Sequence, residues 1–366
     1  MSSPAGPSIK APSRWMALQR EAGRAIAAAA VALLVTFVVV LFTSKAPFEA
    51  FNTLMTAPMS KTRTIGLWID DAAKLTVTGL AFSLVFQARQ FSMGVQGQVY
   101  MGALAATYVA LSPLGQTWAG LPLGVIAGMI AGGAYGFLPG IAKARLVSSL
   151  MLNYIAIDIV NYLLRVQLGA PGMLNTSAFP TSSVYPALVP NTRIDLGLVF
   201  AIVAVIAVWF ALYRTSWGLK LRLVGHNARF AAYSGIRSSF IMVSAMTASG
   251  ALGGLLGSMF VQGQAFAKLT VLFEGNLAFE GILVAIVARS RPLAVPIVAL
   301  AYGYLRQGAQ LMNIRTDVPS EVIGIVTAII ILLVSSSYKL PGRAFFARLF
   351  GRPVDAKIVP ARSAPQ

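Results

Sequence analysis

The chain has 366 residues, of which 57% are hydrophobic and 11% are charged, and its mean hydropathy is +0.74. An ordinary soluble protein carries roughly 25% charged residues, so this composition excludes a set of soluble domains and indicates a chain solvated largely by lipid. The formal net charge is +18, but the cations punctuate apolar runs instead of gathering among polar residues, which argues against nucleic-acid binding. The absence of cysteine and the single histidine exclude disulfides and thiolate metal sites and disfavour His-based catalysis.

The apolar runs predict ten membrane segments, since about 20 apolar residues cross a bilayer. The first covers residues 25–44, and we expect an uncleaved helix because the run is long for a signal peptide and lacks a cleavage site. Between Arg89 and Lys143 lies a charge-free stretch that two prolines and two glycines break into two helices joined by a tight turn. The remaining expected segments are residues 75–88, 146–164, 196–213, 240–262, 276–288, 292–305 and 322–338.

Three of these segments, residues 75–88, 276–288 and 292–305, are short for a span. They are expected to be half-helices or re-entrant pieces, which are tolerated only inside protein or beside a cavity. The predicted fold class is therefore all-α, a polytopic transmembrane helical bundle of about ten segments.

The positive-inside rule orients this bundle with both termini in the cytoplasm. In that orientation 20 of the 29 Lys and Arg residues lie inside, and the acidic residues outside the segments lie mostly on the other side. The expected organisation is a cytoplasmic N-terminal tail (1–24), a transmembrane domain (25–338) and a cytoplasmic C-terminal tail (339–366), in a chain that crosses the membrane several times.

An ordered pattern occurs twice and predicts two repeat-related halves, as in many transporters. The first copy has Val95-Gln96-Gly97, Pro122-Leu123 and Ala134-Tyr-Gly-Phe-Leu138, and the second has Phe279-Glu280-Gly281, Pro292-Leu293 and Ala301-Tyr-Gly-Tyr-Leu305. The spacing differs between the copies, so chance recurrence of small and aromatic residues is the alternative.

The cytoplasmic loop 214–237 is too long for a simple turn. Gly225 and Asn227 suit a helix start, because Asn is a preferred N-cap, residues 228–234 suit a short helix, and Gly235 suits its end. A short exposed helix predicts a docking element, and a merely solvated basic loop is the alternative.

Polar residues within the segments are costly in lipid and mark candidate path positions. Tyr154 and Asp158 share a helix face with Asn161 or Tyr162, next to Asn153, and this face is expected to point away from lipid. Gln96 and Gln98 flank Gly97, and Glu280 holds the matching place in the second repeat.

Such groups suit a neutral polar substrate, and helix–helix hydrogen bonding is the alternative for each. Asp158 and Glu280 also allow a proton relay in an ion-coupled secondary carrier. No phosphate-binding loop, zinc-protease motif or nucleophile elbow occurs, so we expect a transport subunit and no enzyme.

Several motifs give the chain a family resemblance. Phe91-Ser-Met-Gly-Val-Gln-Gly-Gln98 and Gly102-Ala-Leu-Ala-Ala106 resemble the F-N-I-G-x-E-G-Q and G-A-L-A-A stretch of bacterial ABC-importer permeases for simple sugars and nucleosides. Ser149-Leu-Met-Leu-Asn-Tyr-Ile-Ala156 resembles the T-L-M-L-N-Y-I-A signature of the nucleoside-type branch, and Val318-Pro-Ser-Glu-Val322 also matches. Residues 221–236 resemble L-R-A-V-G-x-N-P-x-A-A-x-x-x-G-I, the family's loop that contacts the ATPase.

The resemblance implies a permease subunit for nucleosides, with a simple sugar such as a pentose as the alternative. Its implied partners are an ABC ATPase that binds the ATP, a second permease of a different chain, and an extracytoplasmic substrate-binding protein, with no cofactor in this chain. The implied coupling residues are Gly225, His226, Asn227, Arg229, Ala231, Ala232 and Gly235. Gln96, Gln98, Asn153 and Tyr154 fall on the family's motifs near the expected path, and Asp158 and Glu280 are path candidates from their polarity within the segments. The resemblance also implies a location in the bacterial cytoplasmic (inner) membrane. Ser92 and Gln96 replace the family's usual Asn and Glu, and Ala228 replaces a Pro.

Overall fold

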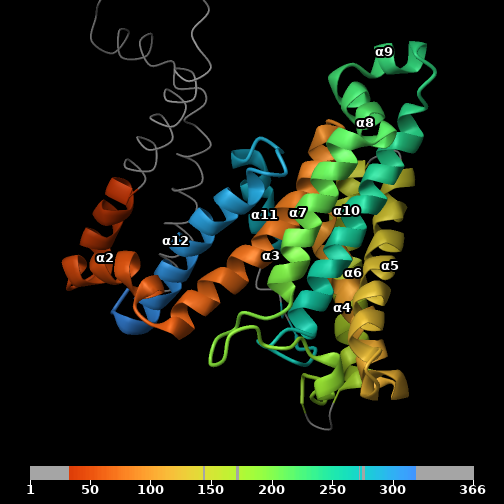
Figure 1. Ribbon diagram of the computed structural model, residues 1–366. Helices are drawn as coiled ribbons and strands as arrows, with labels where there is room; N and C mark the ends of the chain where they lie inside the picture. Colours follow the sequence, from red (N-terminus) through yellow and green to blue (C-terminus); the bar gives the residue numbers. More distant parts are fainter. Residues whose placement is uncertain (1–32, 143–144, 170–172, 272, 274–276, 319–366) are drawn as a thin grey trace, which may run out of the picture. The chain divides into compact units, whose positions relative to one another are not determined.

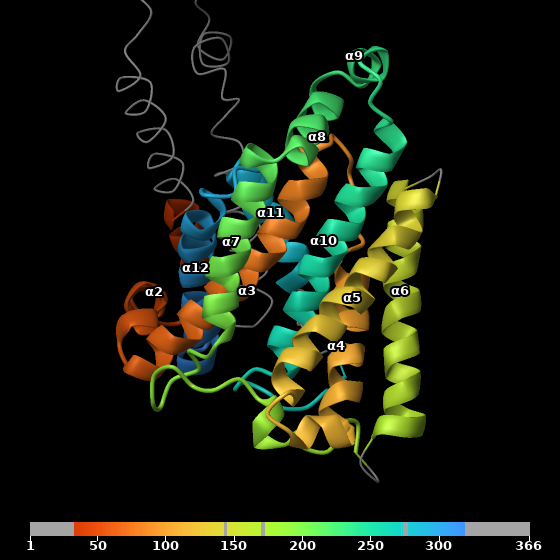
Figure 2. The same cartoon turned by 45° about the vertical axis from the view of Figure 1, so that its right-hand side comes forward.

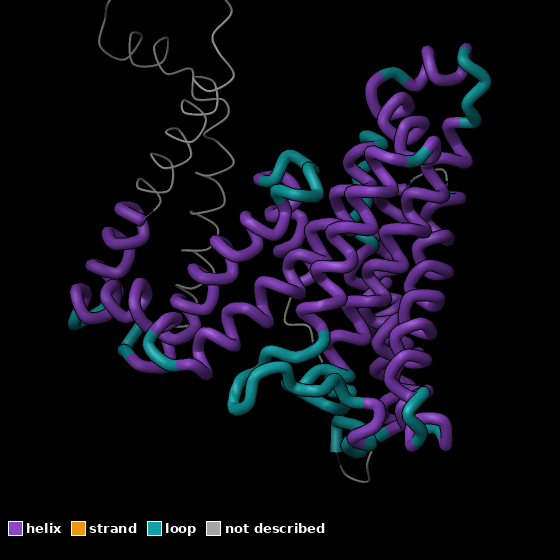
Figure 3. Tube along the Cα trace, in the orientation of Figure 1, coloured by secondary structure: helices purple, strands orange, loops and turns teal. Residues whose placement is uncertain are grey.

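The computed structural model describes residues 33–142, 145–169, 173–271, 273 and 277–318, which form helices and loops without a β-strand (Figures 1 and 3). The described residues from Phe37 to Val318 belong to one compact unit. The described part of the first predicted segment, residues 33–43, is helical. The two tails, the last predicted segment (322–338) and Glu321 of the final family motif lie outside the described residues.

The described helices follow the apolar runs of the sequence. They are α2 (Pro47–Thr56), α3 (Thr62–Gln87), α4 (Val95–Leu111), α5 (Gly120–Ile141), α6 (Arg145–Leu163), α7 (Gly197–Arg214), α8 (Ser216–His226), α9 (Ala228–Tyr233), α10 (Ser238–Val261), α11 (Leu277–Val287) and α12 (Val295–Arg315). Short 3-10 turns occupy Ala57–Met59, Pro113–Gln116 and Thr181–Ser183, and a π-helical turn, Leu164–Leu168, extends α6.

Four of the described helices are long and apolar enough to cross a membrane: Gly120–Ile141, Val147–Leu168, Gly197–Arg214 and Ser238–Val261. They coincide with four predicted segments, and the tight turn expected at Pro113 joins α4 to α5. The total of ten segments and the repeat-related halves stay predictions.

Two segments expected to be short are full-length helices. α3 has 26 residues and begins at Thr62, and α12 has 21 residues and continues to Arg315. The prediction ended both segments at charged residues, but these charges are paired inside the protein: Lys74 donates to Asp70, and Arg306 donates to Asp71, each at 2.8 Å or less. α11, with 11 residues, is short as expected.

Helices α4, α5 and α10 pack closely together, and glycines make this approach possible (Figure 2). A Cβ atom on Gly254 of α10 would lie 1.9 Å from the backbone oxygen of Gly128 on α5, and one on Gly102 of α4 would lie 2.3 Å from Gly254 Cα. Small residues at helix contacts are the usual way in which helices associate in lipid, where burial of apolar surface adds little. α3 in turn contacts α7, α10, α11 and α12.

Three of the described segments that are predicted to be cytoplasmic lie at one end of this unit. The end of α3, the α8–α9 segment and the turn between α11 and α12 lie at that end, and the α6–α7 loop lies at the opposite end (Figures 1 and 2). The two ends therefore match the alternation that the charge distribution predicts.

Candidate functional site

Asn153 of α6 holds the start of α4. Its Oδ1 accepts a hydrogen bond from the backbone N–H of Gly97 at 2.8 Å, and its Nδ2 donates to the carbonyl of Met93 at 2.6 Å. One turn earlier on α6, Ser149 Oγ accepts from the backbone N–H of Met93 at 3.2 Å. Because the first N–H groups of a helix lack partners within it, the family-like motif 149–156 serves here as a clamp on the family-like motif 91–98.

The two predicted glutamines of α4 are buried. Gln96 is 9% exposed and Gln98 is 2% exposed. Gln98 projects among small residues of the neighbouring helices, since a Cβ on Gly253 would lie 2.8 Å from its Cβ. Its Oε1 accepts no hydrogen bond from the described residues, so this atom is a polar group without a protein donor in the packed interior.

Tyr154 and Asp158 lie on the exposed side of α6. Tyr154 is 69% exposed, Tyr162 is 64% exposed, and Asp158 is also exposed, whereas Asn153 on the same helix faces inward at 2%. The three therefore share a face, and none of the helices that the structure describes covers it. An exposed carboxylate in an apolar helix is costly in lipid.

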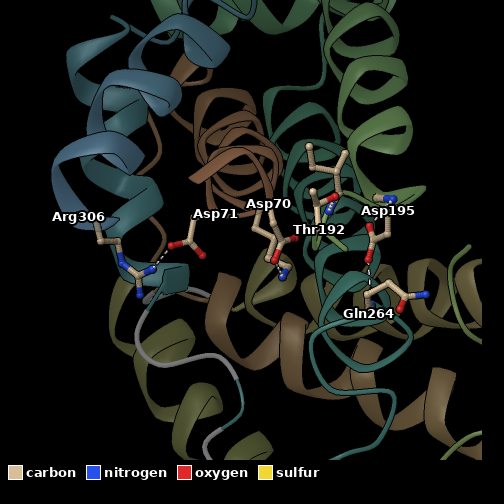
Figure 4. A network of polar contacts seen from close by, with 9 residues as sticks. Asp70, Asp71, Thr192, Asp195, Gln264 and Arg306 are labelled. Carbon is tan, nitrogen blue, oxygen red and sulfur yellow. Dashed lines mark hydrogen bonds and ion pairs between the residues drawn. The ribbon is translucent and has the colours of Figure 1, made fainter. Parts of the chain in front are cut away.

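Glu280 lies in an ion-pair network that joins three helices. Arg306 Nε of α12 lies 2.8 Å from Glu280 Oε2 of α11, and Arg306 Nη1 lies 2.8 Å from Asp71 Oδ2 of α3. The three side chains are between 12% and 21% exposed. Figure 4 shows Arg306 and Asp71 turned toward each other, with Asp70 next along α3.

A second buried pair lies on the same stretch of α3. Lys74 Nζ lies 2.7 Å from Asp70 Oδ2, with side-chain exposures of 5% and 9%, and 5.0 Å from the centroid of the Phe260 ring on α10. Sequence reasoning missed Asp70, Asp71, Lys74 and Arg306 as site candidates because it placed them in loops. Charges inside an apolar bundle are expected to pair with one another, and that is the signal that could have found them.

The end opposite α8–α9 is ordered by Asp195, which the sequence did not single out. Its carboxylate accepts from the backbone N–H groups of Gly197 at 2.8 Å and Gln264 at 2.9 Å, which joins the α6–α7 loop to the end of α10 (Figure 4). Burial raises the pKa of Asp195, since desolvation penalises the charged form more than these two hydrogen bonds favour it. A cavity of about 560 Å³ lies beside it, lined by Trp118, Tyr185 and Gln264 among others.

The loop 214–237 forms the short helix that the sequence predicts. Asn227 caps α9, with Oδ1 accepting from the backbone N–H groups of Arg229 and Phe230 at 3.1 Å each, and Gly235 follows with φ +74°. Ala231 is buried, whereas His226, Arg229, Ala232 and Gly235 are exposed. Phe230 and Tyr233 are 56% and 91% exposed, so this helix presents aromatic surface as docking elements do.

Gly225, in the last turn of α8 just before α9, is held by packing against α3. Gly225 is buried against α3, where a Cβ atom would lie 1.9 Å from the carbonyl oxygen of Gln87. α9 is thus connected through α8 to the end of α3 by direct packing. The structure confirms the helix, and its role toward an ATPase stays a prediction.

No group of three or more His, Asp or Glu side chains in the described part of the chain is placed to hold a metal ion. The structure brings Asn153 and the α4 motif together, and it leaves Asp158 and Glu280 apart, one exposed on α6 and the other paired with Arg306. A proton relay that uses these two acids stays a prediction.

The chain matches the family described as branched-chain amino acid transport system / permease component over residues 65–335. It is 35% identical over 286 residues to the guanosine ABC transporter permease protein NupP of Bacillus subtilis, covering 75% of this chain and 82% of that protein. It is 26% identical to the nucleoside ABC transporter permease protein NupB of Lactococcus lactis, with 80% and 84% covered. It is also 26% identical to the glucose ABC transporter permease protein TsgB13 of Haloferax volcanii, with 85% and 87% covered. No solved structure matches the chain.

Proposed function

The chain belongs to the permease family of branched-chain amino acid transport systems and is an integral membrane protein, and from that premise we propose that it forms the translocation path of an ATP-driven importer for nucleosides. The observation that carries the proposal is the 35% identity to a guanosine permease over most of both chains. A nucleoside permease is also among the relatives at lower identity. The nucleoside-type motif 149–156 includes Asn153, which bonds the backbone at the start of α4. These bonds are a structural reason for the motif to occur in this chain.

A sugar is the second candidate substrate, and a specific relative favours it. The glucose permease of Haloferax volcanii is 26% identical over 332 residues. Its identity is lower than that of the guanosine permease although its coverage is higher, so we place nucleosides first.

The second permease subunit is proposed to cover the exposed face of α6. Tyr154, Asp158 and Tyr162 lie on that face, and a carboxylate facing lipid alone would cost several kcal/mol. A path between two permeases would place these groups beside a polar substrate, which agrees with the expectation from the sequence. The sequence resemblance favours a different chain as this partner.

The two ends of the helical unit are the proposed docking sites for the other two partners, the ATPase and the substrate-binding protein. The capped helix α9 and its exposed aromatic residues support docking of an ATPase subunit on the cytoplasmic side of the bacterial inner membrane. The opposite end, ordered by Asp195, supports docking of an extracytoplasmic binding protein. ATP is bound and hydrolysed by the ATPase, and this chain contributes no catalytic group.

The proposal is tested by uptake of labelled guanosine in cells that have or lack this chain, with the ATPase and binding protein present. Excess unlabelled ribose or glucose is added as a competitor in parallel. Uptake that depends on the chain and resists both sugars is the expected result. Loss of the dependence, or full displacement by a sugar, would overturn the nucleoside assignment.

A further inference from the structure

A small polar pocket lies where three helix ends meet beside α9. It has a volume of about 190 Å³ and is lined by residues from the ends of α3, α8 and α11. Four basic residues contribute to it: Arg89, Arg222, His226 and Arg289. None of the described residues that line it is an Asp or a Glu.

Two of the arginines occupy the same position in two similar turns. Arg89 follows α3 and Arg289 follows α11, and both have φ +51°. In each turn the next residue donates its backbone N–H to the carbonyl five positions earlier, Gln90 to Val85 at 3.2 Å and Ser290 to Ala285 at 2.8 Å. This closure is common at helix ends but usually uses glycine or asparagine at the left-handed position, so an arginine at both turns is unusual.

The pocket is held by contacts between its three walls. Gln87 Nε2 donates to the carbonyl of Ser290 at 2.9 Å, which joins the α3 turn to the α11 turn. Gly225 packs against the Gln87 carbonyl and joins α8 to the same point. Arg222 is held with its guanidinium 5.0 Å from the centroid of the Tyr213 ring. These contacts fix the backbone of the three walls and the Arg222 side chain, and the basic residues line the space between the walls.

Gathering guanidinium groups at one place is unfavourable unless an anion neutralises them. Arginine binds carboxylates and phosphates through two parallel N–H groups, and such charge-assisted bonds are strong. Arg89 is exposed and forms no ion pair among the described residues. The chemistry of the pocket therefore calls for an anionic group.

The position of the pocket indicates where that group comes from. His226 lines it, and the next residue, Asn227, caps α9. The ends of α3, α8 and α11 that line the pocket lie at the same end of the helices as α9 (Figure 1), the end at which we propose that the ATPase docks. We propose that the pocket receives an Asp or Glu side chain of the ATPase subunit, an inference that rests on the proposed function.

Binding of the purified ATPase to the permease complex in nanodiscs of neutral phosphatidylcholine tests this. Arg89→Glu is expected to weaken binding by tenfold or more, because it brings like charges together. Arg89→Asn is the milder variant, since asparagine tolerates positive φ, and it is expected to weaken binding several-fold and to flatten the salt dependence. Arg291→Glu is the matched control, two residues beyond Arg289 and lining a different pocket, and should change binding less than twofold.

The outcomes separate this inference from the proposed function. Binding by the unaltered complex that Arg89→Glu leaves unchanged would overturn the pocket assignment and leave the permease function standing. Failure of the unaltered complex to bind any ATPase, with no ATP-dependent uptake, would overturn both. An effect of Arg89→Glu that appears only in nanodiscs with phosphatidylglycerol would assign the pocket to a lipid phosphate instead.

Discussion

Asn153 illustrates how single polar side chains act in this protein. Both ends of its amide bond the backbone around the start of α4, and it is almost fully buried. The motif made Asn153 a candidate for the path, but the sequence could not show its partners, because Met93 and Gly97 lie 60 and 56 positions away. Asp71 and Arg306, 235 positions apart, were missed for the same reason. Contacts of this range depend on the packing of helices and not on local pattern.

Replacing Asn153 is expected to destabilise the fold. Asn153→Leu removes both hydrogen bonds and leaves the Gly97 N–H and the Met93 carbonyl buried without a partner, at a cost of about 2–4 kcal/mol. Denaturant unfolding in detergent measures the loss. Tyr154→Phe, the adjacent exposed residue, is the control and should change the free energy of unfolding by less than about 0.5 kcal/mol. Equal stability of the two variants would contradict the clamp.

Arg306 is expected to be required for the stability of the fold, because it neutralises the carboxylates of Asp71 and Glu280. Arg306→Met leaves Asp71 and Glu280 without their cation and should cost about 3–5 kcal/mol in unfolding free energy. The triple variant Asp71→Leu, Glu280→Leu, Arg306→Met removes all three charges and should recover most of that loss. Yield of monodisperse protein and unfolding in detergent report both effects. If Arg306→Met is as stable as the original protein, the ion pairs do not hold the three helices.

At the scale of helices, the long uncharged runs predicted the positions of α5, α6, α7 and α10 within a few residues. The prediction of α9 was also correct, because the Asn cap and the Gly end are local signals. α3 and α12 were cut short because their charges are paired inside the protein, Lys74 with Asp70 one turn earlier on α3 and Arg306 with the distant Asp71. α2 and α8 were missed because neither is long enough or apolar enough to resemble a span.

Any side chain at Gly254 is expected to disrupt the packing of α10 against α4 and α5. Gly254→Ala would place Cβ 1.9 Å from the Gly128 oxygen, so the helices must separate, at a cost of about 1–3 kcal/mol or more. Gly133→Ala on α5 is the control, since its Cβ would lie 3.5 Å from the backbone oxygen of Thr247, an ordinary contact distance. Thermal unfolding in detergent should show a lower midpoint for Gly254→Ala alone. Similar midpoints for both would contradict close packing at this glycine.

The cap of α9 is expected to matter for transport more than for insertion. Asn227→Ala removes the acceptor of two N–H groups and should destabilise the helix by about 0.5–2 kcal/mol. Uptake per unit of membrane-inserted protein is then expected to fall several-fold. Asn227→Ser keeps a capping oxygen and should retain most of the activity. Full uptake by the Ala variant would show that a formed α9 is not needed for coupling.

At the scale of the whole molecule, one end carries α9 and the other the loops ordered by Asp195, with packed helices between them. Gly225 against Gln87 links α9 to α3, and α3 carries the buried charges that contact α10 and α12. These contacts connect α9 continuously to the interior of the bundle. The sequence indicated the two ends through its charge distribution, but the connection became visible only in the packing.

The central claim is that this chain transports nucleosides by coupling to ATP hydrolysis in a partner. The most direct test is accumulation of labelled guanosine in proteoliposomes that contain this chain, its partner permease and the ATPase. The binding protein is added on the side that corresponds to the extracytoplasmic face. Accumulation that requires ATP and persists after every ion gradient has been collapsed is the predicted result. Accumulation driven by an ion gradient without ATP would contradict the claim and identify a secondary carrier.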